Sequence, residues 1–504
     1  MAIETELKLR IAPEYLKQIK QHPFLRTISC GRAISRNFYS IYFDTPDLQL
    51  NHQKMALRLR RIGTNWLQTL KGGGGVQAGL HQRNEWETPV AREKLDFDAL
   101  EKVGATPLPE TLRKKVKPLF ITEFTRSIRL VKFEGSLIEI GLDSGEIRSG
   151  KSRHPISELE LELKSGDPLQ LFRLALALLD IVPLEIETTS KAEYGYRLKF
   201  PVKPIVHKAQ ITNIDVETPV KDVFQSMIWS CLLHLQANVP GAISNAEDEY
   251  LHQVRVALRR LRVALNMTSK LHSDEELDSL SKHVEEIGTE LGRSREWDVF
   301  VAEILPSISK DSDANEWKLT LARESEKHRQ LSHQLVESIL LSAEFQRTLL
   351  RFGAWMYGEY WKNFSNSDSL LHNSEIILQG YARKILLRGK LIHEDFNNKQ
   401  LHKLRIACKN LRYSSELLTS LSGLNSDNAQ AKALVKLQDT LGRVNDNVVA
   451  LHLLDELSKG ANFDNINMIQ KGIMKNHSRH LKEFHKQWKT FRLTLDATTF
   501  TLLQ

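Results

Sequence analysis

Two patterns of hydrophobic and polar positions divide this chain of 504 residues. Over roughly the first 200 residues, apolar and charged side chains alternate along short stretches, which is the period of a β-strand with one apolar face. From residue 219 onwards apolar residues return at helical spacing nearly to the end. The pattern therefore predicts a strand-rich N-terminal half and an all-helical C-terminal half.

The opening stretch, 3–11, shows the alternation most clearly. One face is apolar or small, and the other carries Glu4, Glu6, Lys8 and Arg10. About eight such strands are expected, the others near 37–43, 56–62, 66–71, 81–87, 122–132, 139–143 and 157–164. Short helices are expected at 13–22 and 168–180, and the run Gly72 to Gly75 is interpreted as a flexible hairpin turn.

Charged residues on one face of most of these strands favour a closed barrel over an open sheet. Carboxylates gathered in a lumen repel one another unless cations separate them, and clustered Lys and Arg need anions for the same reason. A lumen that holds a divalent metal and a polyanion satisfies both sets. The predicted fold class is α+β multidomain, with a closed antiparallel β-barrel that forms a tunnel, followed by an all-α helical bundle with internal duplication.

Composition narrows the class of protein. The net charge of +8 favours anionic partners without naming one. The three cysteines, Cys30, Cys231 and Cys408, are widely spaced and form no C-x-x-C, which indicates a reducing compartment and no zinc site. No basic-then-apolar leader and no run of about 18 apolar residues is present, so a cytoplasmic protein without a membrane partner is expected.

The N-terminal half also carries a set of motifs in a fixed order. Glu4-x-Glu6-x-Lys8 resembles the opening signature of the CYTH family, the triphosphate tunnel metalloenzymes. The resemblance continues through Tyr42-Phe43-Asp44-Thr45, Leu57-Arg58-Leu59-Arg60, Thr69-Leu70-Lys71, Arg83-Asn84-Glu85, Thr125-Arg126, Leu142-Asp143, the ladder from Glu158 to Glu162, and Ser190-Lys191. It covers 1–200, with 201–218 as a linker, and implies a barrel whose tunnel hydrolyses a triphosphate with Mg²⁺ or Mn²⁺.

The resemblance and the side-chain chemistry together assign roles in the tunnel. Hard divalent cations prefer carboxylate oxygens, so metal ligands are expected among Glu4, Glu6, Glu85, Asp143, Glu158, Glu160 and Glu162. Which two of the last three ligate metal stays open, with Glu160 and Glu162 preferred. Substrate phosphates are expected to bind Lys8, Arg58, Arg60, Lys71, Arg83, Arg126 and Lys191. Catalytic roles are expected for Glu85, through a water-activating second metal, and for Lys8 and Arg60, through charge stabilisation.

The helical half repeats a basic stripe. The pattern His252-x-x-Arg255-x-x-x-Arg259-x-x-Arg262 recurs 150 residues later as His402-x-x-Arg405-x-x-x-Lys409-x-x-Arg412. Leu291-Gly292-Arg293 recurs at the same offset as Leu441-Gly442-Arg443, with Asp298 and Asp446 near matching places. These offsets predict a duplication, with repeats at about 225–310 and 375–460. Residues i, i+3, i+7 and i+10 share a helix face, so each stripe suits an extended anion.

The duplicated stripes resemble the CHAD family, a helical domain often fused behind CYTH domains. The domain is expected to span 219–504, and the resemblance implies that all eight stripe residues bind inorganic polyphosphate. Arg260 and Lys403 are expected to widen the basic surface, and the two histidines to gain charge below about pH 6.5. The aromatic group formed by Trp355, Tyr357, Tyr360 and Trp361 is expected in the bundle core.

The leading hypothesis is hydrolysis of inorganic triphosphate to pyrophosphate and phosphate, with a tethered polyphosphate-binding module. One alternative keeps the tunnel and changes the reaction, to class IV adenylate cyclase or thiamine triphosphatase activity. A second alternative is a non-catalytic protein that binds polyphosphate or nucleic acid. A basic chain permits nucleic-acid binding, but no specific nucleic-acid partner is expected because no recognised motif is present.

Overall fold

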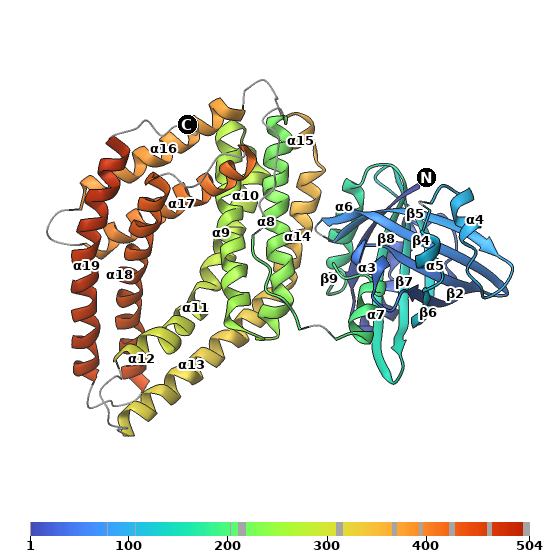
Figure 1. The fold of residues 1–504 in the computed structure, drawn as a ribbon, viewed down its shortest axis with the longest axis horizontal. Helices are drawn as coiled ribbons and strands as arrows, with labels where there is room; N and C mark the ends of the chain where they lie inside the picture. The colour runs from blue at the N-terminus through green and yellow to red at the C-terminus, as the bar shows by residue number, and fades with distance from the viewer. Residues whose placement is uncertain are drawn as a thin grey trace. The chain divides into compact units, whose positions relative to one another are not determined.

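The described part of the chain falls into two compact units (Figure 1). The first unit contains 1–205 together with 341–362, and the second contains 206–340 and 363–504. The computed structural model describes residues 2–77, 79–105, 107–201, 203–209, 218–308, 316–364, 370–392, 397–422, 429–460 and 466–496. Half of the predicted linker at 201–218, namely residues 202 and 210–217, lies outside them.

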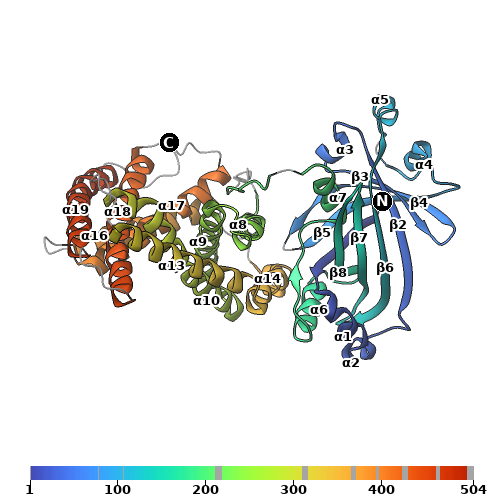
Figure 2. The same ribbon diagram turned by 90° about the horizontal axis from the view of Figure 1, so that it is seen from below.

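Eight strands of the first unit close into an antiparallel barrel (Figure 2). Their order is β5-β4-β3-β2-β6-β7-β8-β1, and β5 pairs back onto β1. A further short strand, β9 (Glu185–Ile186), pairs with β1 alone. The barrel strands are β1 (Ala2–Arg10), β2 (Ile34–Asp44), β3 (Ala56–Ile62), β4 (Asn65–Gln77), β5 (Leu80–Val90), β6 (Lys117–Phe133), β7 (Ser136–Ser149) and β8 (Ser152–Ser165). The predicted closed barrel is confirmed.

Short helices cover the outside of the barrel, so the alternating strands are buried on both faces. On β1 the outward Leu7 and Leu9 are fully buried, and the inward Glu6 and Lys8 are each 6% exposed. Helix α6 packs against β1 and β8. The helices are η1 (Pro13–Tyr15), α1 (Leu16–Gln21), α2 (Pro23–Thr27), α3 (Gln49–His52), α4 (Phe97–Lys102), α5 (Glu110–Arg113), α6 (Leu169–Leu179) and α7 (Lys191–Lys199). Helices predicted at 13–22 and 168–180 are therefore present.

The four-glycine run does not form the turn that its composition predicts. Gly72 to Gly75 lies inside β4, where the pairing with β5 shifts register. Gly73 and Gly74 have φ of 68° and 76°, and a Cβ on Gly74 would lie 1.8 Å from the Gln82 carbonyl oxygen. Glycine is needed here for the irregular strand and its close neighbour rather than for a hairpin turn.

Two helices from the helical half of the sequence belong to the barrel's unit. They are α14 (Ala343–Met356) and α15 (Glu359–Lys362), and α14 packs against α6 and β9. The Tyr357 ring stacks on Phe172 of α6 with ring centroids 5.9 Å apart. The ring centroid of Trp355 lies 4.9 Å from that of Tyr360 and 5.1 Å from that of Trp361. The aromatic group is therefore packed, as expected, but in the barrel's unit and not in the helical bundle.

The second unit is helical, as predicted. Its helices are α8 (Val220–Ile243), α9 (Asp248–Leu271), α10 (Glu275–Glu290), α11 (Gly292–Val299), η2 (Phe300–Ile304), α12 (Leu305–Ile308), α13 (Glu316–Leu340), α16 (Leu370–Lys390), α17 (Asn398–Ser422), α18 (Ala429–Gly460) and α19 (Ile466–Asp496). The helices that carry the two basic stripes, α9 and α17, contact each other, as do α11 and α18. Among the described helices, none has the length and apolar character needed to cross a membrane.

Candidate functional site

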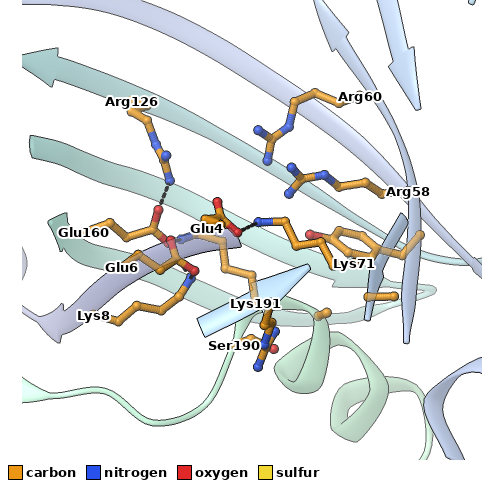
Figure 3. Close-up of a pocket in the computed structure, with 14 residues that line it drawn as sticks. Glu4, Glu6, Lys8, Arg58, Arg60, Lys71, Arg126, Glu160, Ser190 and Lys191 are labelled. Atoms are coloured by element: carbon orange, nitrogen blue, oxygen red, sulfur yellow. Dashed lines mark hydrogen bonds and ion pairs between the residues drawn. The ribbon is translucent and has the colours of Figure 1, made fainter. Parts of the chain in front are cut away.

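The barrel encloses a cavity of about 70 Å³ lined by charged side chains (Figure 3). Seven are cationic: Lys8, Arg58, Arg60, Lys71, Arg83, Arg126 and Lys191. Three are carboxylates, namely Glu4, Glu6 and Glu160, and the remaining lining residues are Tyr42, Ala56, Ser190 and Ala192. All seven predicted phosphate-binding cations are thus brought together at one cavity. Cations outnumber carboxylates there, which suits a polyanionic ligand.

Strand register sets the charge pairs on one wall. Lys8 lies opposite Glu160 of β8, and its Nζ is 2.7 Å from Glu160 Oε1 and 3.1 Å from Glu6 Oε1. Burial alone would raise the pKa of Glu6, but the Lys8 ammonium brings it down to about 2. Burial lowers the pKa of Lys8, but Glu160 and Glu6 raise it by more. Both groups are therefore charged at neutral pH.

A second group of charges lies beside the first. Arg126 Nε and Nη2 each donate to Asp143 at 2.6 Å, while Arg126 also pairs with Glu160. Lys191 Nζ is 2.8 Å from both Asp143 Oδ2 and Glu160 Oε1. Burial alone would raise the pKa of Glu160, but Arg126 and Lys191 hold it well below its usual range. Each carboxylate of this group thus has a cationic partner.

The opposite wall carries Arg58, Arg60 and Lys71. Arg58 Nη2 and Lys71 Nζ each lie 3.4 Å from Glu85 Oε1, and Lys71 pairs with Glu4 as well. Burial and the neighbouring Arg58 lower the pKa of Arg60 to about 10. The buried Arg58 Nε has no hydrogen-bond partner within the described structure. A buried donor without a partner is costly, so this wall is suited to an added acceptor.

Sequence reasoning did not assign Tyr42 or Ser190 to the lining, although both belong to motifs that carry the family resemblance. Tyr42 is 5% exposed, and although burial raises the pKa of its hydroxyl, Arg58 lowers it by more. Ser190 caps α7 by accepting a hydrogen bond from the Glu193 amide at 3.2 Å. A helix N-terminus favours anions. The spacing of Ser190 and Glu193 is that of a capping box, a signal that predicts the helix start.

Four of the predicted metal ligands lie outside the cavity lining. Glu158 and Asp143 lie behind it and pair with Lys191, and Glu85 is next to Lys71. Glu162 lies opposite Glu6 in the β1–β8 register, and its carboxylate is 2.6 Å from Lys164 Nζ. Burial raises the pKa of Glu162. Only Glu4, Glu6 and Glu160 of the predicted carboxylates line the cavity itself.

The carboxylates fit the ligand set of a hard divalent cation. One oxygen from each of Asp143, Glu158 and Glu160 lies within 4.8 Å of the others, and all three residues are buried. Carboxylate oxygens are the ligands that Mg²⁺ and Ca²⁺ prefer. Burial raises the pKa of Glu158 despite its lysine partner, and burial also raises that of Glu4. A cation would relieve this burial of negative charge.

The small cavity shares part of its wall with a wider cavity of about 520 Å³. The two share Ala56, Lys71, Arg83, Ser190 and Ala192. The wider cavity adds apolar side chains and the glycine run of β4, with Leu48, Met55, Val76, Phe200 and Gly73 to Gly75 in its wall. Its size leaves room for a group attached to whatever anion occupies the narrow part.

The helical unit contains a third cavity, of about 960 Å³, which we call the basic cleft. Six of the eight predicted stripe residues line it: His252, Arg255, Arg259, His402, Arg405 and Lys409. The other two do not, because Arg262 pairs with Glu285 and Arg412 with Glu416, each at 2.6 Å. Lys403 lines the cleft as expected. Arg260 does not widen the basic surface, since it is only 7% exposed.

Crowding of cations changes their charge in the basic cleft. Burial, with Arg259 and Arg405 nearby, lowers the pKa of Lys409 to about 5. Burial also lowers the pKa of His252, so this histidine gains its charge at a lower pH than the sequence suggests. The buried Arg405 Nε has no hydrogen-bond partner among the described atoms. An anion would therefore meet a cleft that is not fully protonated at neutral pH.

The carboxylate that matches Asp446 in the duplication is Glu296, not Asp298. Glu296 and Asp446 are 150 residues apart and both line the basic cleft. Burial raises the pKa of each. Asp298 is fully buried elsewhere, where the His333 ring nitrogen Nε2 lies 2.8 Å from its Oδ1.

Each half of the chain matches a known protein family. The family model described as CYTH domain matches residues 2–196, and the one described as CHAD domain matches residues 226–455. An inorganic triphosphatase of Haemophilus influenzae is 36% identical over 198 residues. That match covers 39% of this chain and 55% of the relative, so the chain spans about half the length of this curated protein.

Solved structures extend the comparison. The CHAD domain of the plant Ricinus communis is similar with a TM-score of 0.51 and 28% identity, over 57% of this chain and 97% of that one. A putative adenylyl cyclase from Hippeastrum, described as having a dominant triphosphatase activity, matches with a TM-score of 0.30 and 17% identity, over 40% and 99% of the two chains. The first likeness supports the fold of the helical unit, and the second is too low to carry an argument.

Proposed function

Since the chain carries a CYTH domain followed by a CHAD domain, we propose that its barrel hydrolyses inorganic triphosphate with a divalent metal and that its helical unit binds inorganic polyphosphate. One observation carries the first part: a narrow cavity lined by seven cations and three carboxylates. Such a lining neutralises a polyanion and a metal together. The similarity to an inorganic triphosphatase supports the choice of substrate.

In this proposal the cations exchange partners when substrate binds. In the free tunnel Lys8, Lys191 and Arg126 are neutralised by carboxylates. Phosphate oxygens replace those carboxylates as partners, and arginine presents two donors at once to them. Arg58 and Arg60 approach from the opposite wall (Figure 3). Negative charge that spreads over the transferring phosphoryl group then lies between two walls of fixed cations. Stabilisation of the transition state by such preorganised charges is expected to be the largest contribution to the rate.

The carboxylates released by this exchange are the proposed metal ligands. Glu4, Glu6 and Glu160 line the cavity, with Asp143 and Glu158 next to Glu160. Mg²⁺ or Mn²⁺ is proposed because the donor set consists of oxygens. When bound, such an ion polarises phosphoryl oxygens and lowers the pKa of water. Before substrate binds, Lys191 and Arg126 hold the Glu160 carboxylate in place through the contacts described above.

Glu85 is proposed to act on the water nucleophile. Burial raises its pKa, but Lys71 and Arg58 lower it by more, so the carboxylate is ionised at neutral pH. Its Oε1 lies between these two cations, at 3.4 Å from each. An ionised carboxylate in this place can orient a water molecule by accepting its proton in a hydrogen bond.

The experiment that tests the barrel's function is a substrate panel. The purified full chain with Mg²⁺ or Mn²⁺ is given triphosphate, pyrophosphate, long-chain polyphosphate, ATP and thiamine triphosphate, and phosphate and cyclic AMP are measured. We expect phosphate release from triphosphate to exceed that from every other compound. If ATP is cyclised, or if pyrophosphate is the best substrate, the assignment is wrong.

An organic triphosphate is the second candidate substrate. The observation that favours it is the wider cavity beside the tunnel, whose wall includes Met55, Val76 and Phe200. Apolar walls of this kind hold the non-phosphate part of a ligand. The same panel separates the two candidates, because an organic substrate predicts a lower KM for thiamine triphosphate or ATP than for triphosphate.

Polyphosphate binding is proposed for the basic cleft because both stripes line one cavity. Titration of the full chain with long-chain polyphosphate should give an affinity that falls steeply with salt, since each contact releases counterions. Arg255→Ala with Arg259→Ala, Arg405→Ala and Lys409→Ala should remove most of the binding. The matched control is Arg262→Ala with Arg412→Ala, whose side chains pair with Glu285 and Glu416 outside the cleft. Equal loss in both variants, or equal competition by double-stranded DNA, contradicts the proposal.

A further inference from the structure

Strand β9 extends the barrel wall beside β1, just beyond the point where β5 begins. β1 pairs with β5 as far as Leu7, which lies opposite Leu80, and beyond Lys8 the residues Leu9 and Arg10 pair with β9. A Cβ on Gly79, in the turn before β5, would lie 2.3 Å from Ile186 Cγ2, so β9 is packed directly against that turn. A strand of two residues is too short to be stable by itself. Its position must therefore come from its neighbours.

The inner edge of β9 is joined to the tunnel through the backbone. The amide of Glu187, the residue after β9, donates to the Lys8 carbonyl at 2.9 Å. The Glu187 carboxylate accepts from the Thr189 amide at 2.7 Å and from the Tyr194 hydroxyl at 2.8 Å. Lys191 follows within five residues of Ile186. The segment from β9 to α7 thus connects two of the cations that line the tunnel.

The outer edge of β9 is held by a side chain from a distant part of the sequence. The Ile186 amide donates to Gln346 Oε1 at 2.9 Å. Gln346 belongs to α14, is 6% exposed, and is separated from Ile186 by 160 residues. Its neighbour Arg347 makes a separate contact on the same helix, with Nη2 at 2.7 Å from Asp180 at the end of α6. Helix α14 therefore holds β9 through one residue and α6 through the next.

We propose that Gln346 is a positioning residue for the barrel's reaction, because it fixes β9 and through it the places of Lys8 and Lys191. This inference rests on the proposed triphosphatase function. Gln346 is not among the residues that line the tunnel, so its effect on the reaction is indirect. A fragment of 1–200 would therefore lack α14, the helix that holds β9 in the barrel's unit.

Three variants test the proposal. Gln346→Met keeps the length of the side chain and removes the acceptor, Gln346→Glu keeps an oxygen acceptor, and Arg347→Met removes the contact to α6 but leaves β9. We expect Gln346→Met to lower kcat for triphosphate about tenfold, which corresponds to about 1.4 kcal/mol in the activation barrier. Gln346→Glu should restore most of the rate, and Arg347→Met should keep it. Equal loss in Gln346→Met and Arg347→Met, matched by equal loss of thermal stability, would mean that α14 has only a structural role.

Amide hydrogen exchange gives a readout that does not depend on the reaction. In Gln346→Met the amides from Ile186 to Lys191 should exchange faster than in the wild type, and in Arg347→Met they should not. Unchanged exchange in Gln346→Met overturns the proposal even if activity falls. If the wild-type protein releases no phosphate from triphosphate, the proposed function fails, while the exchange measurement still decides whether Gln346 holds β9.

Discussion

The charge of Lys409 depends on what the basic cleft binds. Its pKa of about 5 means that it is mostly neutral at pH 7 in the free protein. A bound polyanion raises that pKa, so binding takes up a proton. Affinity for polyphosphate should therefore be highest near pH 5 and fall as the pH rises to the pKa of the bound state. Glu296 and Asp446, whose pKa values are raised by burial, act in the same direction.

Calorimetric titrations with polyphosphate at several pH values, each in two buffers of different ionisation enthalpy, measure this proton uptake. Lys409→Gln should take up fewer protons and show a flatter pH dependence than the wild type. Binding without proton uptake between pH 5 and 7 would show that Lys409 is already charged in the free cleft.

The tunnel carboxylates give a sharper prediction at the same scale. Glu6→Gln and Glu160→Gln each keep the shape of the side chain and remove a charge that lines the cavity. Loss of a supporting residue at a metal site costs about 10- to 100-fold, so loss of a ligand should lower kcat by at least about 100-fold. The control is Glu123→Gln, an exposed residue of β6 that pairs with Arg148. Wild-type turnover in both tunnel variants, or equal loss in the control, would contradict the ligand assignment.

Individual residues also show how far a sequence can be interpreted. The alternation of β1 is sufficient to place Glu4, Glu6 and Lys8 on one face, because side chains in a strand alternate with a period of two. It is not sufficient to pair Lys8 with Glu160, since that contact depends on the register between strands far apart in the chain. Asp298 lies close to the place that matches Asp446 in the first repeat, but the offset of 150 residues selects Glu296.

At the scale of elements, α14 is the helix that the sequence could not place. Its apolar residues recur at helical spacing, and Phe345, Leu349 and Phe352 are buried. Such a stripe predicts that a helix packs against something, but it does not identify the partner. The partner is α6 of the barrel's unit. By contrast, the strands of the barrel were predictable because an apolar face and a charged face require a covered outside and a lumen.

Gly353 makes the contact between α14 and α6 testable. A Cβ at this position would lie 2.1 Å from Phe172 Cε1, so Gly353→Ala should force the helices apart and lower the free energy of unfolding by about 1–3 kcal/mol. Gly380→Ala in α16 is the control, because nothing lies within 4 Å of its added Cβ. Alanine there should leave stability equal or raise it by up to about 1 kcal/mol. Urea unfolding followed by tryptophan fluorescence measures both, and an unchanged midpoint in Gly353→Ala would contradict the close packing.

At the scale of the whole molecule, two charged sites occur in one chain, and they differ in kind. The tunnel is narrow and combines carboxylates with cations, whereas the basic cleft is more than ten times larger and is lined by residues from both repeats. The first arrangement suits a short anion held with a metal, and the second suits a long flexible anion. The proposed functions follow from that difference.

The central claim is that the barrel hydrolyses triphosphate only with a divalent metal held by its carboxylates. The most direct measurement is phosphate release from triphosphate by the full chain after metal removal with EDTA, verified by elemental analysis, and again after Mg²⁺ or Mn²⁺ is added back. We predict no release without metal, full recovery on its return, and no recovery in Glu6→Gln. Full phosphate release by the metal-free protein, in excess chelator, would contradict the account.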